Sequence, residues 1–265
     1  MPLSDEVTMR VVPRAFLRVS SRVRVKALFM PKLYPDTAAS GFGKKPKPLK
    51  RPVQARSKFT VQAIYDAFVR IWQRGGWKAV TTRAVALETG IAVGTFYDFF
   101  PDKEALLSGY VRHGIEALLA RIESDVIAPD DLTPPERLQR LVRITCDASL
   151  PGLPPFDHEM LMLEHRIAEP KHHRRVYDEL TTKWQQAITR CADGQPAPDN
   201  ATVQALVTAC WGARRYRLLV QPGDDDAGWL AQMQALVTAR LVAPTTTPSP
   251  PTAETGPARS ARRRP

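Results

Sequence analysis

The pattern of hydrophobic and polar positions in this chain changes near residue 57. From there to about residue 242, apolar residues recur every three or four positions, which is the spacing of amphipathic helices. The first of these helices has its apolar face at Phe59, Ala63, Ile64, Ala67, Phe68, Ile71 and Trp72. No segment shows a pattern typical of a β-strand. We therefore predict an all-α fold.

Glycine, proline and capping residues predict where the helices begin and end. Gly75-Gly76 should end the first helix, and Thr81 is placed to cap the second. A long helix should follow Pro101 and end before Pro129. The remaining predicted helices cover residues 133–150, 156–168, 170–191, 199–220 and 226–242, the first of them beginning with a capping box at Thr133 and Glu136.

The two ends of the chain have a different composition. Residues 1–58 hold fourteen Lys/Arg and three Asp/Glu, a surplus that equals the net charge of +11 of the whole chain. We interpret residues 1–56 as a disordered basic extension and residues 244–265, rich in Pro, Thr and Arg, as a disordered tail. The basic cluster before the first helix is either a solvated linker or an arm that follows DNA, and it comprises Lys44, Lys45, Lys47, Lys50 and Arg51.

The segment from Thr81 to Leu107 carries the most specific pattern. Two short helical patterns are joined at Gly90-Ile91-Ala92, and a third begins after Pro101, which is the arrangement of a helix-turn-helix. Phe96 and Phe100 lie four residues apart and should pack inward. The second helix would then present small and hydroxyl side chains outward, at positions suited to a DNA groove: Val93, Gly94, Thr95 and Tyr97.

Residues 57–107 resemble the DNA-binding domain of the TetR/AcrR family of transcriptional repressors. The shared residues are Thr81, Val85-Ala86, Gly90-Ile91, Gly94-Thr95-Phe96-Tyr97 and Phe100-Pro101-Asp102-Lys103-Glu104-Ala105-Leu106-Leu107. The resemblance implies phosphate contacts by Thr81, Thr82, Arg83, Tyr97 and Lys103, and base-facing positions at Val93, Gly94 and Thr95. It covers about a fifth of the chain.

Two positions depart from the family pattern. Ala92 stands where a serine often caps the recognition helix, a loss of about 1 kcal/mol. Val93 replaces a polar residue that many members use to read bases, and a valine can only contact a thymine methyl group or follow the shape of the groove.

The resemblance also implies a C-terminal domain, here residues 108–243, that binds a small ligand and forms a homodimer. The dimer would use helices 199–220 and 226–242, with candidate interface residues Trp211, Tyr216, Leu218, Leu219, Trp229, Met233 and Leu236. Candidate pocket residues, which a helical bundle would equally use as core, are Phe156, Met160, Met162, His165, Tyr177 and Trp184.

Other classes of function find little support in the sequence. No nucleophile–base set, phosphate loop or metal-ligand spacing is present, so we expect neither an enzyme nor a metal or cofactor site. The three cysteines, without a C-x-x-C pair, and the lack of a long apolar run favour a cytoplasmic protein that does not cross a membrane. The expected function is a ligand-released repressor bound to double-stranded DNA; the alternative is a ligand-independent activator or DNA-organising protein of the same fold.

Overall fold

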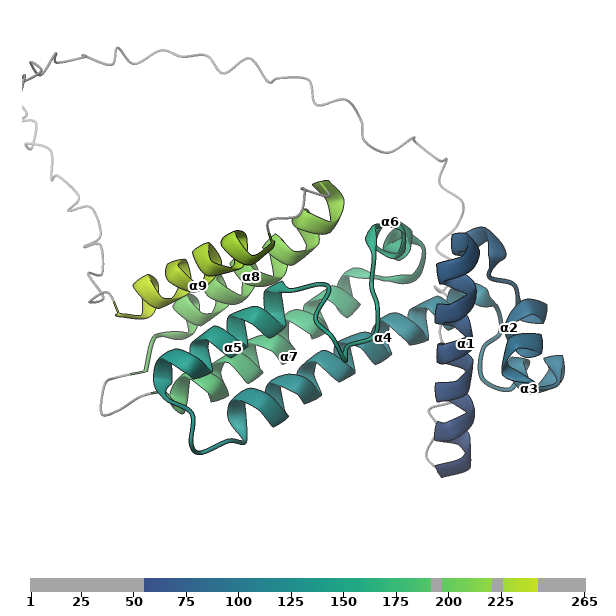
Figure 1. Cartoon of the computed structure of the whole chain (residues 1–265), viewed down its shortest axis with the longest axis horizontal. Helices are drawn as coiled ribbons and strands as arrows, with labels where there is room; N and C mark the ends of the chain where they lie inside the picture. Colours follow the sequence, from purple (N-terminus) through teal and green to yellow (C-terminus); the bar gives the residue numbers. More distant parts are fainter. Residues whose placement is uncertain (1–54, 192–196, 221–225, 243–265) are drawn as a thin grey trace, which may run out of the picture. The chain divides into compact units, whose positions relative to one another are not determined.

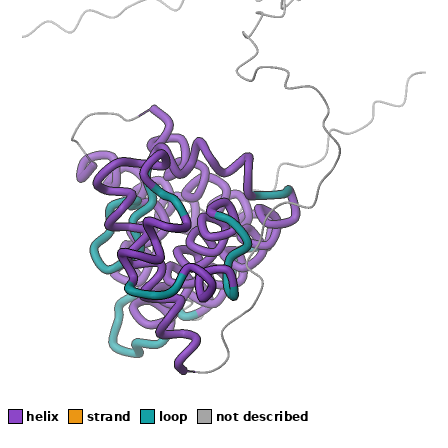
Figure 2. Tube along the Cα trace, turned by 90° about the vertical axis from the view of Figure 1, so that its right-hand side faces the viewer, coloured by secondary structure: helices purple, strands orange, loops and turns teal. Residues whose placement is uncertain are grey.

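The computed structural model describes residues 55–191, 197–220 and 226–242, and every regular element within these ranges is a helix (Figure 2). This agrees with the predicted all-α class. The helices are α1 (Ala55–Ala79), α2 (Thr82–Thr89), α3 (Val93–Tyr97), α4 (Lys103–Ile122), the π-helical turn η1 (Glu123–Ile127), α5 (Pro134–Cys146), α6 (His158–Ile167), α7 (Pro170–Thr189), α8 (Asn200–Val220) and α9 (Asp226–Val242).

Helices α1, α2 and α3 pack at the N-terminal end of α4 and form what we call the head, residues 55–110 (Figure 1). Its core is aromatic: the rings of Phe68 and Tyr110 lie 4.8 Å apart, and those of Phe96 and Phe100 lie 5.7 Å apart. Met160 and Ile167 of α6 are buried in the same core. Helix α6 therefore packs on the head although it lies far along the chain.

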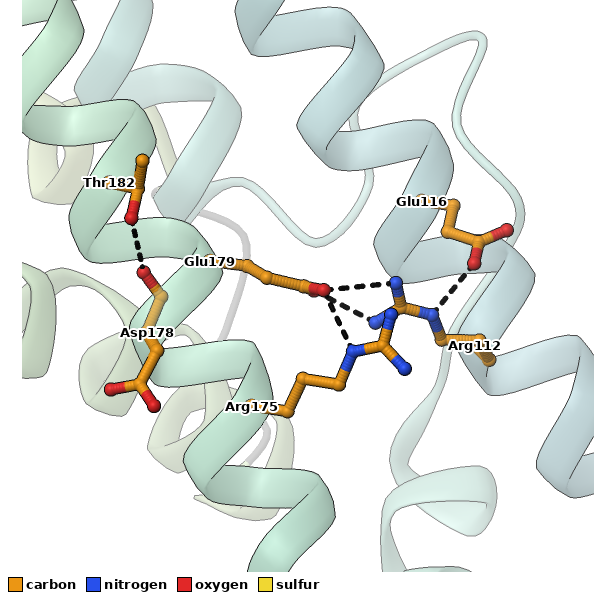
Figure 3. A network of polar contacts seen from close by, with 6 residues as sticks. All are labelled: Arg112, Glu116, Arg175, Asp178, Glu179 and Thr182. Atoms are coloured by element: carbon orange, nitrogen blue, oxygen red, sulfur yellow. Dashed lines mark hydrogen bonds and ion pairs between the residues drawn. The ribbon is translucent and has the colours of Figure 1, made fainter.

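The second core belongs to what we call the body, formed by α5, α7, α8 and α9 with the C-terminal half of α4. Trp184 is fully buried at its centre, and its indole Nε1 donates to Thr145 Oγ1 at 3.2 Å. An ionic cluster on the surface ties α4 to α7, since Glu179 accepts from Arg112 at 2.8 and 3.2 Å and from Arg175 at 2.8 Å (Figure 3).

Two predicted helix ends are wrong by a few residues, and local hydrogen bonds explain both. The helix predicted to reach Leu150 ends at Cys146, because Asp147 is extended and its Oδ1 accepts from Ser149 N, a turn that competes with the helix. The helix predicted from Phe156 begins at His158, because Asp157 caps it by accepting from Met160 N at 2.9 Å.

The predicted break at Gly75-Gly76 is present as a kink within α1, where both glycines leave helical geometry. Gly76 has φ of +60°, a left-handed conformation that favours glycine, and a Cβ atom there would lie 2.7 Å from Glu159 Oε2. The basic extension and the Pro/Thr/Arg-rich tail lie outside the described residues, apart from the first turn of α1.

Candidate nucleic-acid interface

The first part of the candidate interface is the beginning of α2. Thr81 is extended, and its Oγ1 accepts from Ala84 N at 3.0 Å, which confirms the predicted cap. Arg83 in the first turn is exposed and makes no ion pair or hydrogen bond with any other described residue. Its guanidinium is thus exposed to solvent, and the phosphate contact stays a prediction.

The turn between α2 and α3 has the geometry that its glycine predicts. Gly90 has φ of +75° and ψ of 25°, and its N–H donates to carbonyl oxygens at the end of α2. Ile91 N then donates to Ala86 O at 3.0 Å and closes the turn. This left-handed glycine sets the angle at which α3 leaves the first helix of the motif.

Two buried phenylalanines orient helix α3, as predicted. Phe96 and Phe100 are buried in the head core, so the opposite edge of the helix faces outward. Val93 is 41% exposed, Tyr97 is 46% exposed and Gly94 is exposed. No side chain caps α3 at Ala92, which agrees with the missing hydroxyl noted in the sequence.

One contact joins the two helices of the motif at their outer edges. Tyr97 Oη and Thr82 Oγ1 lie 3.3 Å apart, a hydrogen bond that either hydroxyl can donate. The first turn of α2 and the outer edge of α3 thus form one surface. None of its members is buried: Thr81, Thr82, Arg83, Val93, Gly94, Thr95 and Tyr97.

Lys103, the eighth predicted contact, lies apart from this surface. Its Nζ is 4.1 Å from the centre of the Trp77 ring and 3.4 Å from Trp77 O, and the side chain is partly buried. The ammonium is thus held by the last turn of α1.

The charges around the surface are mostly basic or paired. Glu88 of α2 is bound by Arg70, at 2.7 Å, and by Arg74. Hydrogen bonds from Arg74 and then Arg70 hold the pKa of Glu88 below its usual range. Asp98, at the C-terminal end of α3, is an exposed acid next to Tyr97. The proposed arm residues Lys44, Lys45, Lys47, Lys50 and Arg51 lie outside the described residues.

The predicted ligand pocket needs correction. Among its six residues, only Phe156 lines either of the two cavities that adjoin α8. Met160 is buried in the head core and Trp184 in the body core, where each fills space between helices. Met162 and His165 are exposed because they lie on the outer face of α6, and Tyr177 packs against the body core.

The larger of these cavities is a feature that the sequence did not predict. It has a volume of about 720 Å³, and Phe156, Trp229 and Leu230 are among its apolar lining residues. Three arginines also line it: Arg143, Arg214 and Arg217. Arg214 and Arg217 are three residues apart in a largely apolar helix and therefore lie on the same helix face. This spacing is the sequence signal that could have indicated the basic side of the cavity.

Neither a metal site nor a membrane-spanning helix is found in the described ranges. Within them, no three His, Cys, Asp or Glu side chains gather closely enough to hold a metal ion. None of the helices in these same segments combines the length and the apolar character needed to cross a bilayer.

Comparisons with known proteins agree with the helix-turn-helix assignment. Residues 60–109 match the family described as bacterial regulatory proteins, tetR family. The HTH-type transcriptional repressor KstR of Mycolicibacterium smegmatis is 38% identical over 79 residues, which cover 30% of this chain and 38% of the relative. KstR of Rhodococcus jostii is also 38% identical, over 30% of this chain and 35% of its own length. The match thus spans well under half of these relatives.

Solved structures resemble a larger part of the chain. A TetR transcription regulator from Haloarcula marismortui superimposes with a TM-score of 0.52 at 16% identity, covering 69% of this chain and 97% of that protein. A TetR-family regulator from Mesorhizobium loti gives a TM-score of 0.50 at 15% identity over 71% and 96% of the two chains. At these identities the likeness shows the fold. Together, these comparisons show a tetR-family sequence match confined to residues 60–109 and a fold like that of solved TetR-family regulators.

Proposed function

We propose that this protein is a homodimeric transcriptional repressor that binds double-stranded DNA and is released by a small ligand. The observation that carries the proposal is the surface joined by the hydrogen bond between Tyr97 and Thr82. It combines hydroxyl groups, an exposed arginine and a side-chain-free position at Gly94 on a short projecting helix. Such groups can bind phosphates and approach base edges in a major groove.

The proposed roles follow from position on this surface. Val93, Gly94 and Thr95 lie on the first turn of α3, which would enter the groove. Thr81, Thr82, Arg83 and Tyr97 flank that turn and would bind phosphates on either side. Lys103 would contribute a phosphate contact from beside the Trp77 ring.

The proposed dimer uses α8 and α9. Tyr216 is 66% exposed and Leu236 is 63% exposed, and Leu219 and Val220 are also exposed, so an apolar face is open on these helices. Met233, one of the predicted interface residues, is instead buried in the body core. A twofold dimer would present two heads to the two half-sites of a near-palindrome.

Helix α6 offers a physical route from ligand to DNA. Glu159 Oε1 of α6 accepts from Trp77 N of the head at 3.4 Å, and Arg166 of α6 donates to Glu104 of the head at 3.0 Å. On the other side, His158 Nδ1 lies 2.9 Å from Leu218 O of α8. A ligand that binds more tightly to one position of α6 would favour one spacing of the two heads. The larger cavity, which His158 of α6 helps to line, favours DNA binding controlled by a ligand over a ligand-independent architectural role.

The experiment that tests the function is footprinting of the purified full-length protein on the DNA upstream of its own gene. We expect protection of two half-sites about one helical turn or a multiple of it apart. Sedimentation of the same protein should show the mass of two chains. The experiment is done at a salt concentration at which the protein does not bind a nonspecific duplex. If the protein then protects no sequence in the upstream DNA, it is not a repressor of this kind. A cytoplasmic location is part of the same proposal, because the DNA lies there.

A further inference from the structure

Two cavities meet beside Arg214 of α8. The larger, of about 720 Å³, lies within the size range of small-ligand pockets in proteins. The smaller, of about 40 Å³, has an apolar wall that includes Ile115, Leu118 and Trp211. Phe156, Arg214 and Leu218 line both, so the two spaces adjoin at these residues.

Arg214 is a buried cation, 6% exposed. Its Nη1 donates to the backbone oxygen of Asp147 at 2.6 Å, and the Trp211 ring lies 5.6 Å away. Among the described residues, no carboxylate comes within 4.0 Å of its guanidinium, whereas the neighbouring Arg215 is bound by Glu164. Within the part of the chain that the structure describes, Arg214 is therefore a buried charge without a counter-charge in direct contact.

Burial of a charged group is unfavourable and lowers the pKa of a cation. Loss of solvation lowers the pKa of Arg214 to about 10, an effect that the charge of Asp147 offsets in part. The guanidinium still carries its charge at neutral pH. Removing a cation from water is strongly unfavourable unless an anion compensates it. Among the described residues the charge of Arg214 meets no anion in direct contact, and a bound anion would supply one.

No carboxylate among the described residues that line the larger cavity forms an ion pair with Arg214. Arg143 is exposed and Arg217 lies 4.3 Å over the Trp229 ring. Asp157 is already bound to Trp72 Nε1 and Met160 N, and Asp147 Oδ1 accepts from Ser149 N. Both aspartates that line the cavity are thus already hydrogen-bonded to groups other than the Arg214 guanidinium.

We propose that this cavity binds an amphipathic organic anion, whose carboxylate or phosphate pairs with Arg214 while its apolar part packs against Phe156, Leu218 and Trp229. The proposal deepens the function proposed above by giving the ligand a chemical class, and it rests on that function only for the effect on DNA. Arginine suits both anionic groups because its planar guanidinium can donate two parallel hydrogen bonds.

The test measures binding to the free full-length protein, without DNA, by isothermal titration calorimetry. The probes share a ten-carbon chain and are used below their micelle concentrations: decanoate, decyl phosphate, 1-decanol and decyltrimethylammonium. We expect at least one anion to bind about tenfold or more tightly than 1-decanol, and the cation to bind weakest. Preference for decanoate or for decyl phosphate distinguishes a carboxylate from a phosphate ligand. Equal binding of the anions and 1-decanol would overturn the proposal.

Substitution of Arg214 gives a second test. Arg214→Met should remove the preference for anions and leave 1-decanol binding unchanged, while Arg214→Lys should keep part of it. Arg174→Met, at an exposed position on α7, is the control and should behave as the wild-type protein. Unchanged anion binding in a folded Arg214→Met protein would refute the site. If that variant does not fold, the comparison of probes on the wild-type protein decides.

The two proposals can fail separately. Anion binding that depends on Arg214, in a protein that protects no DNA, would support the site and refute the repressor. If the protein binds DNA sequence-specifically but binds decanoate, decyl phosphate and 1-decanol equally well, the repressor is supported and the anion site is refuted.

Discussion

The indole Nε1 of Trp72 donates to Asp157 Oδ2 at 2.7 Å, and this bond joins the head to the residue that caps α6. The other carboxylate oxygen of Asp157 accepts from Met160 N. Asp157 also lines the larger cavity. One carboxylate therefore contacts the head, the start of α6 and the space where a ligand would bind.

This bond should couple the two residues energetically. We expect a double-mutant cycle of Trp72→Phe and Asp157→Ala to give a coupling energy of about 1 kcal/mol in urea unfolding. The cycle cancels the loss of the α6 cap, which both Asp157 variants share. A coupling energy near zero would mean that the contact does not hold the head and α6 together.

Ala92→Ser should stabilise the head. Ala92 is extended, with φ of −65° and ψ of 146°, and no side chain accepts from the exposed N–H groups of α3. A serine there can accept one of them, which typically contributes about 1 kcal/mol. The measurement is the free energy of unfolding by urea. The matched control is Thr81→Ala, which removes the existing cap on α2 and should destabilise by a similar amount. A destabilising Ala92→Ser substitution would contradict this geometry.

The protein should lose stability at alkaline pH. Burial, with a smaller effect of the Glu116 charge, raises the pKa of Tyr65 well above its usual value of 10.0, and burial raises that of Tyr110 likewise. In the unfolded chain these phenols release protons near pH 10 while the folded protein keeps them. The free energy of unfolding therefore falls as pH rises above about 10.

Tyr65→Phe tests this dependence, since it removes one of the two groups. The fall in unfolding free energy above pH 10, measured relative to pH 7, should be shallower by up to about 1.4 kcal/mol per pH unit. Equal slopes for the wild-type and variant proteins would show that Tyr65 already ionises normally in the folded state.

The N-terminal basic cluster gives a prediction about salt. If the segment from Lys44 to Arg51 follows the DNA, deletion of residues 1–50 should flatten the plot of log affinity against log salt, by roughly one unit for each phosphate that the segment neutralises. The relevant data are binding isotherms on one operator, recorded over a salt range of about 50 to 200 mM. A slope that stays the same would assign this cluster to a solvated linker.

Local patterns in the sequence predicted the helices well. The Thr81 cap, the glycine turn at Gly90 and the inward pair Phe96 and Phe100 depend on neighbours within a few positions, and all are found as predicted. At the start of α5, Glu136 accepts from Thr133 N as a capping box requires, while the Thr133 side chain makes no cap bond to the backbone. The errors at Asp147 and Asp157 are also local, since an aspartate can cap a helix or end one by bonding the backbone nearby.

The cavity was not predictable in the same way. A Met- or Trp-rich helix face is the same pattern whether it fills a core or lines a pocket, and Met160 and Trp184 fill cores. The cavity depends on how α5, α8 and α9 approach one another, although α5 lies far from the other two along the chain. The position of Lys103 depends likewise on Trp77, a contact 26 residues away.

The decisive measurement for the proposed DNA-binding edge of α3 is the operator affinity of the double variant Thr95→Ala, Tyr97→Phe, recorded by fluorescence anisotropy beside its sedimentation behaviour. Both changes remove hydroxyl groups from the outer edge of α3 and leave Phe96 and Phe100 in place. We expect affinity to fall by about tenfold or more, while the variant sediments as the wild-type protein does. An unchanged affinity in a properly assembled variant would contradict the assignment of this edge to DNA.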